Sequence, residues 1–154
     1  MLPIAALIAI ELLSRPPVSG FVVGYQVEKN GNLIIEQVPN GENVDRWSRM
    51  VTTQRFAGVA RRSDGNGFLQ LMLNGLQRGC PGARVVYRRP SGRTAQMRVD
   101  CPRNPGTGLP EIFFAKAIPG ASDMHVAQVA FRRVPNARDV AWAETYLRGV
   151  TLKP

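Results

Sequence analysis

Residues 80–101 read CPGARVVYRRPSGRTAQMRVDC and contain the only two cysteines of the chain, Cys80 and Cys101. Two strand-like runs flank the PSG sequence at 90–92, which is typical of a type I turn closed by a glycine bulge. The segment therefore predicts a β-hairpin. A disulfide across its base would tie the end of a preceding helix to the second strand and contribute roughly 3 kcal/mol. The alternative is a pair of reduced, buried cysteines.

The three-residue loop also predicts how the two strands of this hairpin pair. The expected pairs are Tyr87–Ala95, Val85–Met97 and Ala83–Val99, all on one face. Arg84, Arg88 and Arg98 then share the opposite, outward face. A two-residue loop would turn Arg84 and Arg88 inward, because a slip of one residue moves every side chain to the other face. We therefore expect the first register.

A second hairpin is predicted at Asn30-Gly31, because a type I′ turn requires a positive φ at both central residues. Its strands cover 21–29 and 32–38, and the expected pairs are Val23–Val38, Tyr25–Glu36 and Val27–Ile34. Glu36 is the one charged residue on this apolar face. A buried carboxylate is either paired or functional. The alternatives are an ion pair with Arg46, Arg49 or Arg55, or an exposed position at the sheet edge.

The rest of the chain predicts an α+β fold. Val44, Trp47 and Met50 recur every third residue, which indicates a short helix in which Trp47 is structural. The other expected elements are a strand at 51–56, a helix from Asp64 or Asn66 to Gly79, strands at 111–118 and 124–132, and a helix from Asn136 to Gly149. We expect residues 21–154 to form a single domain, with a mainly antiparallel sheet of about seven strands. Two or three helices cover one side of it.

Residues 1–20 are a possible signal peptide or apolar leader. Residues 2–13 are almost wholly apolar and too short to span a bilayer, and VSG at 18–20 resembles a cleavage site. No basic residue precedes the apolar run and Glu11 interrupts it, so a misplaced start or a mature amphipathic segment are alternatives. Together with the cysteines, this leader predicts a periplasmic or secreted protein without a membrane span. The protein is cytoplasmic if the leader is not a signal.

The chain is strongly basic, with a net charge of +9, and arginine supplies all but three of its 20 basic residues. Arginine suits the recognition of phosphate and carboxylate groups. The arginines are scattered, however, and no aromatic residues alternate with them. An acidic polymer is therefore an alternative partner, bound weakly through Arg84, Arg88 and Arg98, and nucleic acid is not the expected polymer.

No motif in the sequence defines a reaction. His125 is the only histidine, and no spacing of possible ligands suggests a metal site around it. Phosphate-binding glycine loops and nucleophile motifs are missing from the sequence. We expect no cofactor and no catalytic residues. An unrecognised hydrolase that uses Glu36 or His125 is the third hypothesis, and it requires a nucleophile close to one of them.

Residues 36–54, EQVPNGENVDRWSRMVTTQ, resemble a segment common to small exported proteins of proteobacteria. These proteins share a Gly-Glu-x-Val-x-x-Trp-Ser/Thr-x-Met-Val-Thr pattern, and they are also similar at CP (80–81) and CPRNP (101–105). The resemblance implies export and a fold but no activity. The order of elements also resembles that of PsbP-like α/β sandwiches. Our first hypothesis is an exported, non-enzymatic protein that binds a partner in the cell envelope.

Overall fold

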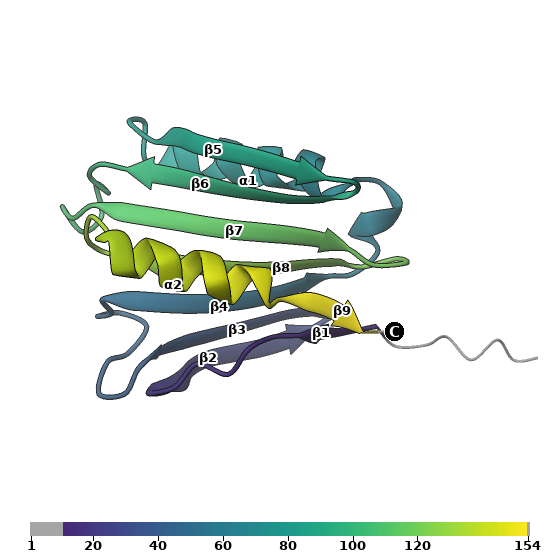
Figure 1. Cartoon of the computed structure of the whole chain (residues 1–154), viewed down its shortest axis with the longest axis horizontal. Helices are drawn as coiled ribbons and strands as arrows, with labels where there is room; N and C mark the ends of the chain where they lie inside the picture. The colour runs from purple at the N-terminus through teal and green to yellow at the C-terminus, as the bar shows by residue number, and fades with distance from the viewer. Residues whose placement is uncertain (1–10, 154) are drawn as a thin grey trace, which may run out of the picture.

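The computed structural model describes residues 11–153, which form a sheet with a helix on each side (Figure 1). All neighbouring strands of the sheet are antiparallel. The spatial order of the seven strands is β2 (Phe21–Lys29), β3 (Asn32–Pro39), β4 (Arg49–Phe56), β8 (Met124–Phe131), β7 (Glu111–Pro119), β6 (Thr94–Cys101) and β5 (Arg84–Ser91). The predicted α+β fold with a seven-stranded antiparallel sheet is therefore confirmed.

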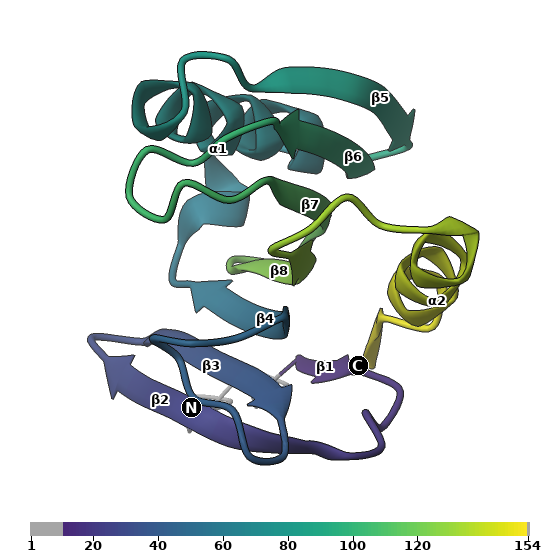
Figure 2. The same ribbon diagram turned by 90° about the vertical axis from the view of Figure 1, so that its left-hand side faces the viewer.

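The two α-helices lie on opposite faces of the sheet, as Figure 2 shows. α1 (Gly65–Gly79) follows the short 3-10 helix η1 (Val59–Arg61), and its core side meets Ala115 and Ala117 of β7. α2 (Ala137–Arg148) packs with Ile112 and Phe114, the alternate residues of the same strand. The prediction that the helices cover one side is wrong. The central strands are apolar on both faces, and each apolar face needs a cover.

The segment before the main sheet forms part of the fold. β1 (Leu12–Ser14) pairs antiparallel with β9 (Thr151–Lys153). Leu13 packs against the core beneath α2, and Arg15 Nη1 donates a hydrogen bond to Thr53 Oγ1 of β4 (2.7 Å). Residues 1–10 of the expected leader lie outside the described residues. A chain that began at residue 21 would lack these contacts.

The helix expected around Trp47 is absent, and residues 40–48 form turns before β4 begins. Side chains satisfy the backbone of this segment. Glu42 accepts hydrogen bonds from the N–H and the hydroxyl of Ser48 (2.6 and 2.7 Å), and Asn43 Oδ1 accepts two from the backbone just after it. Val44, Trp47 and Met50 pack together nevertheless, with Val38 and Ala130. The three-residue spacing therefore reflects packing in one core cluster and not a helix.

The Asn-Gly hairpin forms as predicted, with φ values of 54° at Asn30 and 79° at Gly31. The pairs Tyr25–Glu36 and Val27–Ile34 are confirmed. A bulge between Val23 and Tyr25 then shifts the register, so that Val38 lies opposite Val22 rather than Val23.

The register predicted for the second hairpin is wrong. Gly92 has a φ of 58° and begins a two-residue loop, so that Ser91 pairs with Thr94 and Pro90 with Ala95. β5 is an edge strand, and an edge tolerates the missing N–H of Pro90. A bulge between Val85 and Tyr87 then places Val85 opposite Val99 rather than the expected Met97. Arg88, opposite Met97, therefore lies on the other side of the hairpin from Arg98 and leaves the expected outward set.

Candidate functional site

Half of the sheet face that carries α1 has a cavity instead of a helix. α1 packs on β5, β6 and β7, while a cavity of about 260 Å³ lies over β3, β4 and β8 and reaches β7. We call it the Glu36 pocket. Its polar lining is Glu36, Thr52, Gln54, Glu111 and Gln128, and its apolar lining is Ile34, Val44, Trp47, Met50, Phe113 and Ala130.

Strand register places the polar floor of the pocket. Thr52 lies opposite Glu36 on one side and Gln128 on the other, so that the three residues form one row across β3, β4 and β8. In the next row, Gln54 Oε1 accepts a hydrogen bond from Gln128 Nε2 (3.1 Å). Thr52 is only 8% exposed, and its hydroxyl has no hydrogen bond within the described part of the chain. The floor therefore offers a free hydroxyl beside a carboxylate.

Glu36 has no cation beside it. Within residues 11–153 its carboxylate makes no ion pair and no hydrogen bond, and burial raises its pKa. Two of its expected partners are used elsewhere. Arg55 pairs with Glu28 (2.7 Å), and the Arg49 guanidinium lies 5.2 Å from the ring centre of Phe21. The ion pair offered above as a structural explanation of Glu36 is therefore not formed.

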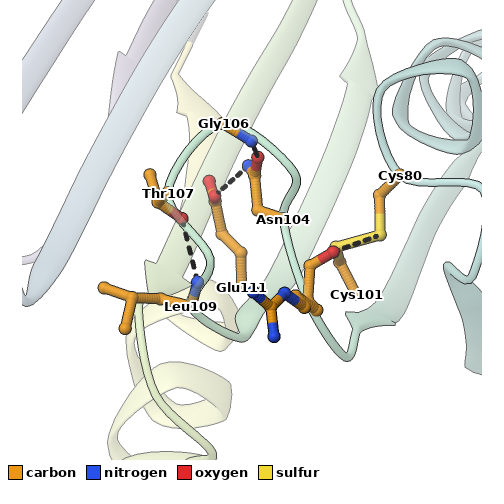
Figure 3. Close-up of a disulfide and its surroundings, with 8 residues drawn as sticks. Cys80, Cys101, Asn104, Gly106, Thr107, Leu109 and Glu111 are labelled. Atoms are coloured by element: carbon orange, nitrogen blue, oxygen red, sulfur yellow. Dashed lines mark hydrogen bonds between the residues drawn. A yellow bond between two sulfur atoms is a disulfide. The ribbon is translucent and has the colours of Figure 1, made fainter.

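A second carboxylate, Glu111, closes the far end of the pocket. It begins β7, is 8% exposed, and accepts a hydrogen bond from Asn104 Nδ2 at 2.6 Å. The other end of the Asn104 amide accepts the N–H of Gly106, which fixes the turn of the loop after β6 (Figure 3). Sequence reasoning missed Glu111, because no local pattern shows that a residue next to a Pro- and Gly-rich loop faces Glu36 across the intervening strands.

Trp47 forms an apolar wall of the pocket and is also part of the core. Its side chain is 8% exposed and packs with Val38 and Met50. The Arg132 guanidinium lies 4.1 Å from the Trp47 ring centre, and its Nη1 donates to the Asp45 carbonyl oxygen. The structural role expected for Trp47 thus has a physical basis, and the residue also shapes the site.

Exposed apolar side chains border the pocket on β2. Tyr25 lies opposite Glu36 and Val27 opposite Ile34, and both are more than 40% exposed. Val22, opposite the buried Val38, continues this stripe. Contiguous exposed apolar surface with a polar border is typical of interaction sites. We call the pocket and this stripe together the open face.

Cys80 and Cys101 lie in disulfide geometry, with sulfur atoms 2.10 Å apart and Cα atoms 6.1 Å apart (Figure 3). Cys80 caps the C-terminus of α1 and Cys101 ends β6, and both are buried in the core beneath α1. The pair thus lies where the hairpin predicted it, between the end of the helix and the second strand.

The hairpin arginines do not form one surface. Arg84 is exposed and lies opposite Asp100. Arg88 Nη2 donates to Gln70 Oε1 of α1 (2.9 Å), whereas Arg98 lies on the other side of the sheet, over Phe114, and pairs with Asp100 at 2.8 Å. Of the three arginines expected on one face, Arg84 and Arg98 lie on the same side of the hairpin and Arg88 lies on the other, because the shorter loop and the bulge change the register.

His125 lies on the face of the sheet opposite Glu36. It is 3% exposed, its pKa is lowered mainly by burial, and it lines a cavity of about 160 Å³ beneath β1 with Arg15 and Thr53. The structure therefore does not bring His125 and Glu36 together. Across residues 11–153, no cluster of three potential metal ligands is found. No helix in the same part of the chain is long and apolar enough to cross a membrane.

Comparison with protein-family models and with curated protein sequences finds no match. Among solved structures, the chain is similar to the Ran-binding protein Mog1p of Saccharomyces cerevisiae, with a TM-score of 0.62 and 11% identity over 92% of this chain and 94% of that one. It is also similar to a mutant form of the protein Mog1, with a TM-score of 0.59 and 11% identity over 90% and 89% of the two chains. At this identity, the likeness establishes that the chain has the α+β fold of Mog1p.

Proposed function

We propose that this is an exported, non-enzymatic protein that binds a protein partner of the cell envelope through the open face. One observation carries the proposal. The sheet leaves half of one face without a helix, and there an uncompensated carboxylate, Glu36, lies beside the exposed apolar stripe of β2. A free carboxylate provides specificity, and the apolar stripe provides buried area.

The fold neighbours support protein binding as the general function. Mog1p is described as a Ran-binding protein, and it covers nearly the whole chain. From this likeness we infer only that the present chain also binds a protein. The identity of the Mog1p partner is not transferred, because a fold hosts many functions.

Export is supported by the cysteine pair in disulfide geometry and by the resemblance to exported proteobacterial proteins. The intact mass of protein recovered from its native source tests it, since the mass reports leader removal and thiol state together. Export predicts a shortened chain that is two hydrogens lighter than its reduced form. A full-length chain with two free thiols would contradict it.

Partner binding can be tested with a photo-crosslinking amino acid at Tyr25, in the stripe. Leu71 is the matched control position, because it is 63% exposed and belongs to α1 rather than to the open face. In the envelope fraction of the native host, we expect one adduct of defined mass from position 25 and none from position 71. Equal adducts from both positions, or none from either, would contradict the proposal.

The two other hypotheses gain less support. A polyanion site would need clustered arginines, but Arg88 and Arg98 face opposite sides of the sheet and are engaged with Gln70 and Asp100. A hydrolase would need a nucleophile hydrogen-bonded to Glu36 or His125, and the Thr52 hydroxyl beside Glu36 is not bonded to it. Within residues 11–153, no hydroxyl is hydrogen-bonded to either of them.

A further inference from the structure

We infer that the Glu36 pocket receives a basic side chain, arginine or lysine, which the partner protein inserts. This inference rests on the proposed function, and it adds the chemistry of the partner's anchor. It follows from the charges, the unpaired polar groups and the size of the pocket.

The distribution of charge is the first argument. The chain has 20 basic and 11 acidic residues, so a carboxylate has many possible cations. Four acidic side chains of the described residues form ion pairs: Glu28, Asp100, Asp139 and Glu144. The other described acidic side chains form none, and among those that are not exposed Glu36 alone also lacks a hydrogen bond. Glu111 lines the same cavity and accepts a hydrogen bond from Asn104. A cation supplied by another molecule would compensate Glu36.

The second argument is the Thr52 hydroxyl, which has no hydrogen-bond partner among residues 11–153. This side chain is more than nine-tenths buried, lies beside Glu36 in the row across the sheet, and faces the cavity. The hydroxyl oxygen itself is not fully buried, so it opens to the cavity, where an incoming donor can reach it. A guanidinium or ammonium group carries several donors, so that it can bind the carboxylate and the hydroxyl together.

The rest of the lining fits the stem of such a side chain. Gln54 and Gln128 are neutral, so they add no competing cation, while Ile34 and Phe113 are apolar. Long basic side chains place their methylene groups on surfaces of this kind. The cavity, at about 260 Å³, is smaller than the roughly 300–1,000 Å³ typical of small-molecule sites. It therefore suits a single side chain better than a cofactor.

The overall charge limits the partner further. A net charge of +9 repels a protein that is basic throughout. The complementary partner is acidic or apolar overall and presents one basic residue in an apolar setting that meets Tyr25 and Val27.

A direct test uses butylguanidinium as the probe and NMR of the isotope-labelled chain as the readout. The side-chain N–H signals of Trp47, Gln54 and Gln128 report on the pocket. We expect saturable shifts of these signals with butylguanidinium and none with butyrate, which carries the opposite charge. Glu36→Gln should weaken the binding by about tenfold or more. Glu144→Gln makes the same charge change on α2, away from the pocket, and should leave the binding unchanged.

Binding of the probe that is equal in Glu36→Gln and the unmodified chain would overturn the inference, as would equal shifts with butyrate. Circular dichroism of each variant verifies that it is folded. The two proposals fail differently. If the crosslink at position 25 persists in Glu36→Gln and the unmodified chain does not bind butylguanidinium, the proposed function is supported and the insertion of a basic side chain is rejected. Probe binding without any crosslinked partner supports the pocket chemistry and rejects the function.

Discussion

At the scale of single residues, Glu36 is the one acidic side chain of the described residues that is not exposed and has neither an ion pair nor a hydrogen bond. Asp139 is more deeply buried than the half-buried Glu36, but Arg133 pairs with Asp139 at 2.6 Å and Asp139 accepts the backbone N–H of Asn136. Glu36 has neither a cation nor a donor among residues 11–153. Burying such a group lowers stability, and proteins accept that loss mainly at sites where the group is used.

Replacing Glu36 should therefore stabilise the protein at neutral pH. Burial raises the pKa of Glu36 in the folded state above its unfolded value of about 4.3, so that the protonated form favours folding. This stability is fully present below the unfolded pKa and is lost as the pH rises through the folded pKa. Tyr25 and Glu111 are the titratable groups that face it, and β4 and β8 add only uncharged side chains.

The expected result is a higher Tm for Glu36→Gln than for the unmodified chain at pH 7, with a difference that disappears below about pH 4. Thermal unfolding followed by circular dichroism across this range measures it. Glu144→Gln is the control, because the Glu144 carboxylate lies 3.7 Å from Arg89 and its removal should not raise the Tm. A lower Tm of Glu36→Gln at pH 7 would show that Glu36 has a stabilising partner.

Trp47 is expected to contribute mainly to stability. Trp47→Ala should lower the free energy of unfolding by about 3–5 kcal/mol, as large aromatic truncations in a core do. Its ring is 8% exposed and packs with Val38 and Met50 under the Arg132 guanidinium. Urea denaturation measures the loss, and the exposed Leu71→Ala should change stability by less than about 0.5 kcal/mol. Unchanged unfolding with loss of the crosslink at Tyr25 would instead assign Trp47 to recognition.

At the scale of elements, strand pairing was predicted correctly where the turn requires a positive φ at both of its central residues. Asn30 and Gly31 both have positive φ, and their hairpin pairs correctly up to a bulge. In the other hairpin, the longer loop was preferred because it kept Arg84 and Arg88 on the outward face. The structure instead begins a two-residue loop at Gly92 and leaves Pro90 within β5, because β5 lies at the edge, and edge position is not visible in sequence.

The disulfide is a prediction about how two elements are joined. Cys80 and Cys101 link the end of α1 to the end of β6 across a sequence separation of 21 residues. By the loop-entropy model, replacing both with alanine should lower the free energy of unfolding by about 3 kcal/mol. Urea denaturation measures this loss, and peptide mapping without reductant should find one linked peptide pair. Two freely alkylated cysteines in protein from the native source would contradict the bond and weaken the case for export.

At the scale of the whole molecule, the number of strands in the main sheet was predictable, whereas the short β1–β9 pair and the location of the site were not. Turn signals separate the strands, so that the count of seven followed from local sequence. The side on which each helix packs depends on β7 and β8, which are apolar on both faces. The sequence singled out Glu36 as a misfit, but Thr52, Gln128 and Glu111 join it only through the register of four strands. Such long-range pairing has no local signature.

The positive charge of the molecule is dispersed over both faces of the sheet, and it should give only weak binding to polyanions. Counterion release would supply this attraction, so that retention on heparin should fall steeply as salt rises. Of the hairpin arginines, Arg84 is exposed and free to contribute, whereas Arg98 is 18% exposed, pairs with Asp100 and lies over Phe114. The two residues should therefore behave differently when they are replaced.

Arg84→Gln should elute from heparin at lower salt than the unmodified chain and unfold at the same temperature. Arg98→Gln should lower the Tm, because it breaks the pair with Asp100 and the contact with Phe114 at a site shielded from solvent. No aromatic surface is expected to add base stacking, so that retention should not depend on nucleotide sequence. The prediction of weak binding would be contradicted if the chain bound heparin tightly at physiological ionic strength and both variants abolished that binding. Such a result would favour an acidic polymer over an envelope protein as the partner.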